Sequence, residues 1–79
     1  MITINELQDL INRFNPTVKV KQLPKFREEV RYSIDFENGL SIFITPEGIN
    51  IDDDSKDSLW IRANNKLILI SKYYTHVIL

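Results

Sequence analysis

The stretch VRYSIDFENGLSIFI, residues 30 to 44, places the strongest constraint on the fold. Its first half alternates between an apolar set and a polar set, which are Val30, Tyr32, Ile34 and Phe36 against Arg31, Ser33, Asp35 and Glu37. A period of two residues is typical of a strand with one buried and one solvated face. Asn38-Gly39 predicts a type I′ turn, because both residues tolerate positive φ. We therefore expect a hairpin that returns through Leu40, Ile42 and Ile44.

The segment at the start of the chain predicts one amphipathic helix. Its apolar residues recur at helical spacing, at Ile4, Leu7, Leu10, Ile11 and Phe14. Thr3 and Glu6 predict a capping box, in which each side chain satisfies a backbone N–H of the first turn. We expect the helix to end at Asn15, because Pro16 disfavours helical geometry in the residue before it.

The second half of the chain predicts further strands. Pro46-Glu47-Gly48 indicates a turn before a short strand at residues 49–51, and Asn64-Asn65 indicates a connection between a strand at residues 58–63 and a final strand that begins at Lys66 with KLILIS. No linker or repeat divides the chain, so we expect a single domain spanning residues 1–79. The predicted fold class is α+β, with one N-terminal helix packed on an antiparallel meander sheet of five or six strands.

The last predicted strand is apolar on both faces, through Leu67, Ile68, Leu69 and Ile70, and the chain ends in Val77, Ile78 and Leu79. A strand of this kind requires cover on both sides. One interpretation is a central strand covered by the helix on one side and by residues 52–58 on the other, and this is the one that we favour. The alternative is a surface for a partner, or for a homodimer formed through the apolar C-terminal strand.

Composition excludes several classes of protein. The 79 residues include no cysteine and one histidine, so neither a disulfide framework nor a multi-histidine metal site fits within one chain. The N-terminal segment does not resemble a signal peptide, and no apolar run approaches membrane-spanning length. We expect a cytoplasmic protein that does not enter a membrane. The acidic run IDDDSKD, residues 51–57, fails as a calcium loop, because glycine and glutamate are missing at the required positions.

No catalytic constellation is evident. His76 has neither a nucleophile elbow nor an oxyanion glycine near it, and each of the two glycines, Gly39 and Gly48, is explained by a turn. We therefore predict a protein that is not an enzyme, with no cofactor, no metal and no small-molecule substrate.

Charge is segregated along the chain. The basic residues between positions 19 and 31 are Lys19, Lys21, Lys25, Arg27 and Arg31. The acidic residues follow, and they are Asp35, Glu37, Glu47, Asp52, Asp53, Asp54 and Asp57. The net charge of −1 therefore conceals two oppositely charged regions, and segregation of this kind can steer association.

The opening segment carries a resemblance. Ile4-Asn5-Glu6-Leu7 with Ile11, followed by Thr17-Val18-Lys19-Val20, resembles the helix-then-strand start of a small phage-encoded anti-CRISPR protein that blocks the type II CRISPR nuclease. The resemblance covers about the first quarter of the chain and implies acidic mimicry of DNA without catalysis. No functional residue is carried over, because the matching positions lie in the scaffold.

Two functional hypotheses follow. The first is a small inhibitor or modulator, encoded by a phage or mobile element, that presents the acidic residues listed above to a host or rival protein with a basic groove. The alternative is a nucleic-acid-binding module that uses the basic residues between positions 19 and 31, with Phe26 available to stack on a base. In that case Val18 and Val20 face the core, while Lys19 and Lys21 lie beside Arg31 on the solvated face of the sheet.

Overall fold

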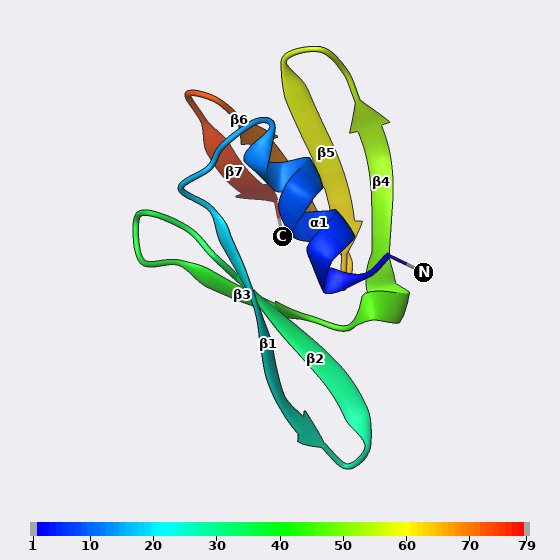
Figure 1. The fold of residues 1–79 in the computed structure, drawn as a ribbon. Coiled ribbons are helices and arrows are strands. Elements are labelled where there is room, and N and C mark those ends of the chain that lie inside the picture. Colours follow the sequence, from blue (N-terminus) through cyan, green and yellow to red (C-terminus); the bar gives the residue numbers. More distant parts are fainter. Residues whose placement is uncertain (1, 79) are drawn as a thin grey trace.

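The computed structural model describes residues 2–78, which form one α-helix, one 3₁₀ turn and seven strands in two antiparallel sheets (Figure 1). The first sheet has the order β1 (Lys19–Phe26), β2 (Glu29–Asp35) and β3 (Ser41–Ile44). The second has the order β4 (Ile49–Asp54), β5 (Ser58–Ala63), β6 (Lys66–Ser71) and β7 (Thr75–Ile78). The fold class is therefore α+β, as predicted. Leu79, the last residue of the predicted apolar end, lies outside the described residues.

The predicted single meander of five or six strands is wrong, because β3 and β4 do not pair. The 3₁₀ turn η1 (Pro46–Gly48) joins these two strands and leads the chain into the second sheet. The side-chain amide of Asn64, from the β5–β6 turn, donates to the Phe43 carbonyl at 2.6 Å. That contact occupies the edge of β3 at which a continued meander would place β4.

The helix α1 (Ile4–Asn12) begins at the predicted cap, where the Thr3 hydroxyl accepts a hydrogen bond from the Glu6 N–H at 3.1 Å. The reciprocal half of the capping box is not formed, because the Glu6 carboxylate accepts from the Thr3 hydroxyl instead. The helix ends at Asn12 rather than at Asn15, although the Asn15 N–H still bonds to the Ile11 carbonyl. The predicted end is therefore too late.

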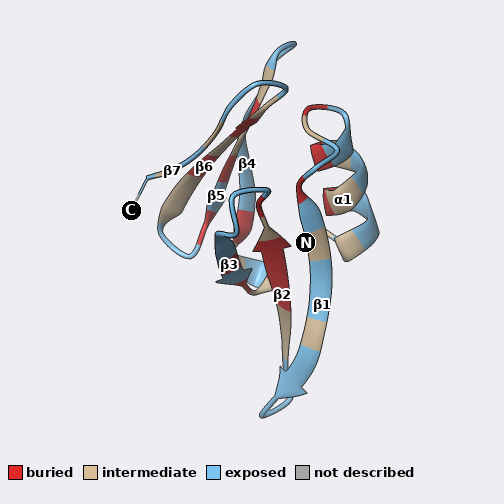
Figure 2. Ribbon diagram, turned by 90° about the vertical axis from the view of Figure 1, so that its left-hand side faces the viewer, coloured by how far each residue is buried: buried red, intermediate tan, exposed pale blue. Residues whose placement is uncertain are grey.

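One core lies between the helix and the two sheets, and Figure 2 shows the buried segments on the sides of these elements that face each other. Its fully buried side chains come from every layer, and they are Leu7, Ile11, Val18, Ile34, Ile44, Leu59, Ile61, Ile68 and Ile70. Two of them come from the helical stripe that the sequence predicted. The strand at residues 58–63 is confirmed as β5, and the strand predicted to begin at Lys66 is β6. It is not the final strand, because the chain turns after Ser71 and continues into β7.

The turn at Asn38-Gly39 differs from the predicted type I′ turn. Positive φ occurs at Gly39, with a value of 91°, but not at Asn38. The Gly39 N–H bonds to the Phe36 carbonyl at 3.0 Å and the Phe36 N–H bonds to the Leu40 carbonyl at 2.8 Å. This is a three-residue loop in which a left-handed glycine closes the hairpin. The hairpin itself is confirmed.

The acidic run also differs from its predicted place. Asp52, Asp53 and Asp54 belong to β4, which extends past Ile51 and pairs with β5 through a bulge between Ile51 and Asp53. The run therefore lies at an edge of the second sheet and does not cover the outer face of β6. On that outer face Leu67 and Leu69 remain partly exposed, while Ile68 and Ile70 are buried in the core.

No helix within residues 2–78 has both the length and the hydropathy needed to cross a membrane.

Candidate functional site: a basic and aromatic sheet face

Strand register gathers three of the predicted basic residues on the outer face of the first sheet. Lys19 is opposite Asp35, Lys21 is opposite Ser33, and Leu23 is opposite Arg31. Directly paired residues project to the same face. Val20 and Ile34, which alternate with these residues along the two strands, pair with each other and pack in the core. Lys19, Lys21 and Arg31 therefore project to the other face.

Phe43 lies on the same outer face, because it is opposite Ser33 in the pairing of β2 with β3. Its side chain is 63% exposed although it is a large aromatic group. An aromatic ring presented to solvent beside lysine and arginine side chains is the arrangement used by sheets that stack nucleic-acid bases. Phe43 was not predicted as a site residue. Its position between Ile42 and Ile44 in an alternating strand does indicate that its ring projects away from the core.

Phe26, which is 53% exposed, lies near the end of the β1–β2 hairpin. The guanidinium carbons of Arg27 and Arg31 both lie 5.3 Å from the centre of its ring. Arg31 also donates to the Pro24 carbonyl at 3.1 Å, while its Nε is shielded from solvent and has no hydrogen-bond partner among residues 2–78. Phe26 therefore holds two arginines in place, and its own ring is already engaged by them.

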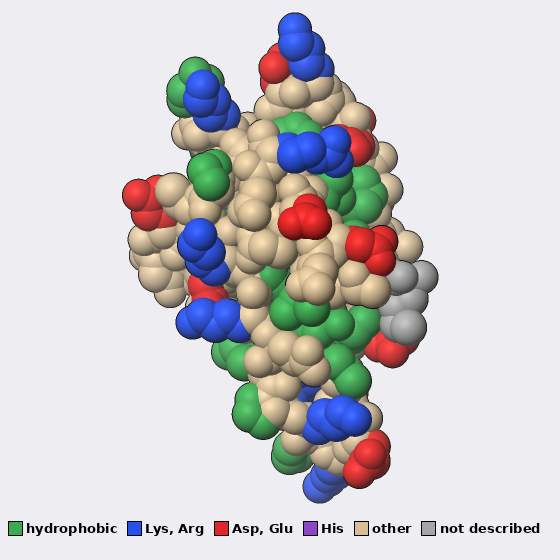
Figure 3. Space-filling model, in the orientation of Figure 1, with side chains coloured by type: hydrophobic (Ala, Val, Ile, Leu, Met, Phe, Trp, Pro, Cys, Tyr) green, Lys and Arg blue, Asp and Glu red, His purple; other side chains and the backbone are tan. Residues whose placement is uncertain are grey.

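We call Lys19, Lys21, Phe26, Arg31 and Phe43 the basic–aromatic face. Lys25 and Arg27 extend it along the hairpin, where every residue from 24 to 29 is exposed. Figure 3 shows basic and hydrophobic side chains over this protruding end, at the bottom of the molecule, with an acidic side chain next to them. The structure thus brings together all five residues of the predicted basic set on one face and its adjoining hairpin.

Asp35 interrupts the basic–aromatic face. Hydrogen bonds from Ser33, from Ser41 and from Lys21 hold the pKa of its carboxyl below the usual range, with Ser33 the largest contributor. Its ion pair with Lys21 spans 3.1 Å. Among residues 2–78 the other basic residues of the set form no ion pair. Four positive charges of this region are therefore available to an anionic partner.

The predicted acidic set is dispersed. Asp35 lies on the basic–aromatic face, Glu37 is in the turn after β2, Glu47 is in η1, and the remaining four residues are on the β4–β5 hairpin, namely Asp52, Asp53, Asp54 and Asp57. Figure 3 accordingly shows acidic side chains scattered over the face in view. The sequence placed these residues in one continuous region, but the turns between strands carry them to different sides.

Part of the acidic hairpin is paired within the chain. The Arg62 guanidinium lies 2.9 Å from the Asp52 carboxylate, and that of Arg13 lies 3.6 Å from the Asp54 carboxylate. Asp53 and Asp57 form no ion pair among residues 2–78. The β4–β5 hairpin therefore presents less uncompensated charge than its sequence indicates.

Residues 2–78 contain no group of three or more histidine, cysteine or acidic side chains placed to hold a metal ion. Lys19, Lys21 and Phe43 of the basic–aromatic face are exposed, and the two clefts beside β7 and beside Phe14 are lined by other residues. An open face suits a polymer or a protein surface better than a small molecule.

Comparisons with known proteins give no match: neither a protein-family model, nor a curated protein, nor a solved structure is similar to this chain.

Proposed function

We propose that the protein is a non-enzymatic binding module that holds single-stranded nucleic acid on the basic–aromatic face. The observation that carries the proposal is the strand register, which places the exposed ring of Phe43 in one cross-strand row with Lys21, on either side of Ser33, on a face that also bears Lys19 and Arg31. A base stacks on the ring while lysine and arginine contact the neighbouring phosphates.

Charge favours this face over the acidic residues. Of the five basic groups on this face and its adjoining hairpin, four have no carboxylate partner within residues 2–78, whereas two of the four aspartates on the β4–β5 hairpin are paired with arginines. Each phosphate neutralised on a single strand changes the slope of log K against log salt by about −0.7. Four phosphate contacts therefore predict a slope no steeper than about −2.8.

The first experiment measures fluorescence anisotropy with a labelled 12-nucleotide poly(dT) strand. Replacing Phe43 by Ala removes the stacking platform, which is worth about 1–3 kcal/mol per base, or a loss of affinity of about 5- to 150-fold. The matched control is Tyr73→Ala, which removes a ring that is 88% exposed in the β6–β7 turn. Equal effects of the two substitutions would contradict the proposal.

A second experiment tests the charges. The double substitution Lys19→Ala and Lys21→Ala should weaken binding and reduce the salt slope, whereas Lys56→Ala on the acidic hairpin should change neither. Asp35→Asn should raise the affinity, because it removes a carboxylate from the face. Duplex DNA should bind no more tightly than the nonspecific range of about 10⁻⁴–10⁻⁶ M. Absence of any salt-dependent binding to the single strand would overturn the proposal.

A second candidate function is an inhibitor that offers the β4–β5 hairpin to a basic groove of another protein, as the resemblance to anti-CRISPR proteins implies. It is supported by the exposure of every residue from Asp52 to Asp57. The triple substitution of Asp52, Asp53 and Asp54 by Asn should weaken binding to such a partner and remove much of its salt dependence. Unchanged binding to a type II CRISPR nuclease, or none in the wild type, would eliminate this candidate.

A further inference from the structure

Two edge strands of the structure have their free backbone groups covered by side-chain amides. On β1, the Gln8 side chain accepts from the Val20 N–H at 2.7 Å and donates to the Val18 carbonyl at 3.2 Å. On β3, the amide of Asn64 donates to the Phe43 carbonyl. Each amide takes the place that a neighbouring strand would otherwise occupy, which is a recognised protection against edge-to-edge association.

The third edge strand, β4, is protected by charge. It carries Asp52, Asp53 and Asp54 and is bent by the bulge next to Ile51. Charged side chains and bulges both oppose pairing with another strand. Three of the four edges in the two sheets are therefore blocked.

The fourth edge, β7, has no such protection from any residue between positions 2 and 78. The Ser71 N–H bonds to the Tyr74 carbonyl at 2.9 Å, and hydrogen-bonded pairs alternate along an antiparallel ladder. The backbone groups of His76 therefore point toward β6, while those of Thr75 and Val77 point away from the sheet. The strand contains no lysine, arginine or acidic residue.

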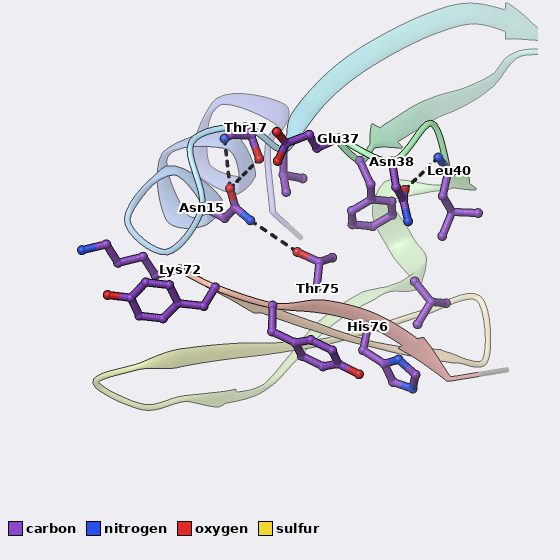
Figure 4. A pocket seen from close by; sticks show the side chains of 13 residues that line it. Asn15, Thr17, Glu37, Asn38, Leu40, Lys72, Thr75 and His76 are labelled. Carbon is purple, nitrogen blue, oxygen red and sulfur yellow. Dashed lines mark hydrogen bonds between the residues drawn. The ribbon is translucent and has the colours of Figure 1, made fainter.

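The space beside β7 is open. A cleft of about 490 Å³ lies between this strand, the segment around Asn15 and the turn around Asn38. In Figure 4 the side chain of Thr75 points across this cleft toward Asn15, while His76 points to the opposite side. One hydrogen bond crosses the cleft, from the Asn15 amide to the Thr75 hydroxyl at 3.4 Å. This cleft lies over the face of β7 to which the Thr75 side chain projects, while the backbone edge of β7 pairs with no other strand of residues 2–78.

We propose that β7 pairs antiparallel with β7 of a second copy, so that two four-stranded sheets join into one. The two-fold axis passes beside His76, and Thr75 of each copy exchanges backbone hydrogen bonds with Val77 of the other. An isologous interface requires a self-complementary surface, and an antiparallel strand pair provides one.

The outward side chains favour a second copy over an unrelated strand. Tyr74 and Ile78 are 52% and 44% exposed, and both lie on the side of His76, with the Tyr74 ring stacked on the imidazole at 5.6 Å between centres. The proposed register places Tyr74 of each copy opposite Ile78 of the other. Aromatic residues and β-branched residues form favourable cross-strand pairs. The exposed apolar groups at the two ends of the edge thus cover each other.

The test is the molar mass of the full chain, measured by light scattering after size-exclusion chromatography over a range of concentrations. The wild type should approach twice the monomer mass as its concentration rises. Val77→Pro should remain monomeric and folded, because the N–H that proline removes points outward and takes no part in the pairing with β6. A wild type that stays monomeric at every concentration, or a Val77→Pro dimer as tight as the wild type, would overturn the proposal.

Charge substitutions test the register. His76→Lys places two like charges opposite each other across the axis and should dissociate the dimer, whereas His76→Val should not. Asn50→Lys, on the same outer face but in β4, is the matched control and should leave the dimer intact. A dimer that persists in His76→Lys would exclude this register. Because the basic–aromatic face belongs to the other sheet, Val77→Pro should leave the affinity per monomer for poly(dT) unchanged, so the two proposals fail separately.

Discussion

The turns of the β5–β6 and β1–β2 hairpins have the same backbone geometry, but their residues differ in how well they tolerate it and in what they contact. Each closes through two residues of positive φ, Asn64 and Asn65 at 51° and 64°, and Arg27 and Glu28 at 51° and 67°. Such turns match the twist of the strands on either side. Asparagine tolerates this conformation, whereas other residues with a side chain are strained there by about 1–2 kcal/mol each.

The difference follows from where the hairpins lie. The β5–β6 hairpin carries core residues of the second sheet, and its turn is fixed to β3 by Asn64. The end of the β1–β2 hairpin protrudes from the core, and Arg27 stacks on Phe26 there. The asparagines of the β5–β6 turn adopt positive φ with little strain and so favour the stability of the fold. Arg27 and Glu28 of the β1–β2 turn are strained, and strained residues of this kind are common at binding sites. Substitutions in the two hairpins should therefore have opposite consequences.

The largest contrast should come from apolar residues of the two hairpins. Ile68→Ala in β6 should lower the free energy of unfolding by about 2–5 kcal/mol, because a fully buried side chain leaves a cavity. Leu23→Ala in β1 should lower it by less than about 1 kcal/mol, since Leu23 is partly exposed. Urea denaturation measures both, and similar losses would show that the protruding hairpin is part of the stable core.

The next effect concerns the β5–β6 turn. Asn64→Ala introduces strain at positive φ and removes the hydrogen bond to the Phe43 carbonyl, so it should destabilise the fold by about 2 kcal/mol. Asn65→Ala is the matched control, because it introduces the strain without losing that bond and should cost about 1 kcal/mol. If the two variants unfold at the same urea concentration, the Asn64 contact contributes nothing to stability.

The opposite sign is expected at the β1–β2 turn. The double substitution Arg27→Asn and Glu28→Gly relieves the strain and should raise the free energy of unfolding by about 1–2 kcal/mol. The same variant should leave the affinity for poly(dT) nearly unchanged, because it removes one cation and one carboxylate from the hairpin. Lys25→Asn is the control that removes a neighbouring cation without changing the turn, so it should weaken binding with no gain in thermal stability. A loss of stability in the double variant would contradict the assignment of strain to this turn.

The smallest effect should come from Asp35 on the basic–aromatic face. Its pKa is lower in the folded state than the ordinary value of 3.8, chiefly because Ser33 and Ser41 donate hydrogen bonds to it. The unfolded state therefore binds more protons in this range, and the stabilisation is present above about pH 3.8 and lost as the pH falls through the folded pKa. Asp35→Asn should show a shallower loss of stability than the wild type between pH 4 and pH 2. Equal slopes in urea titrations would show that these hydrogen bonds do not favour the charged form.

Local patterns were sufficient for most elements of the chain. The helix stripe, β5, β6 and the Asn64-Asn65 turn could be read from periodicity and turn residues, because these depend on neighbours within a few positions. The Arg27-Glu28 turn was missed, since neither residue favours positive φ and the twist of the paired strands imposes that conformation. The same alternation also placed Lys19, Lys21 and Arg31 on one face, and it placed Asp35 on the same face as Arg31.

The sequence by itself determined which residues face the core and which face solvent, because side-chain direction follows from a period of two or 3.6 residues. Only the tertiary structure decided how the hairpins combine into sheets. Alternating strands are compatible with one sheet or two, and the choice depended on contacts between distant residues, such as Asn64 with Phe43 and Gln8 with Val20. Those contacts also block the edges of β1 and β3, whereas the edge of β7 stays open. The arrangement of the two sheets separates the acidic residues and brings the basic residues together.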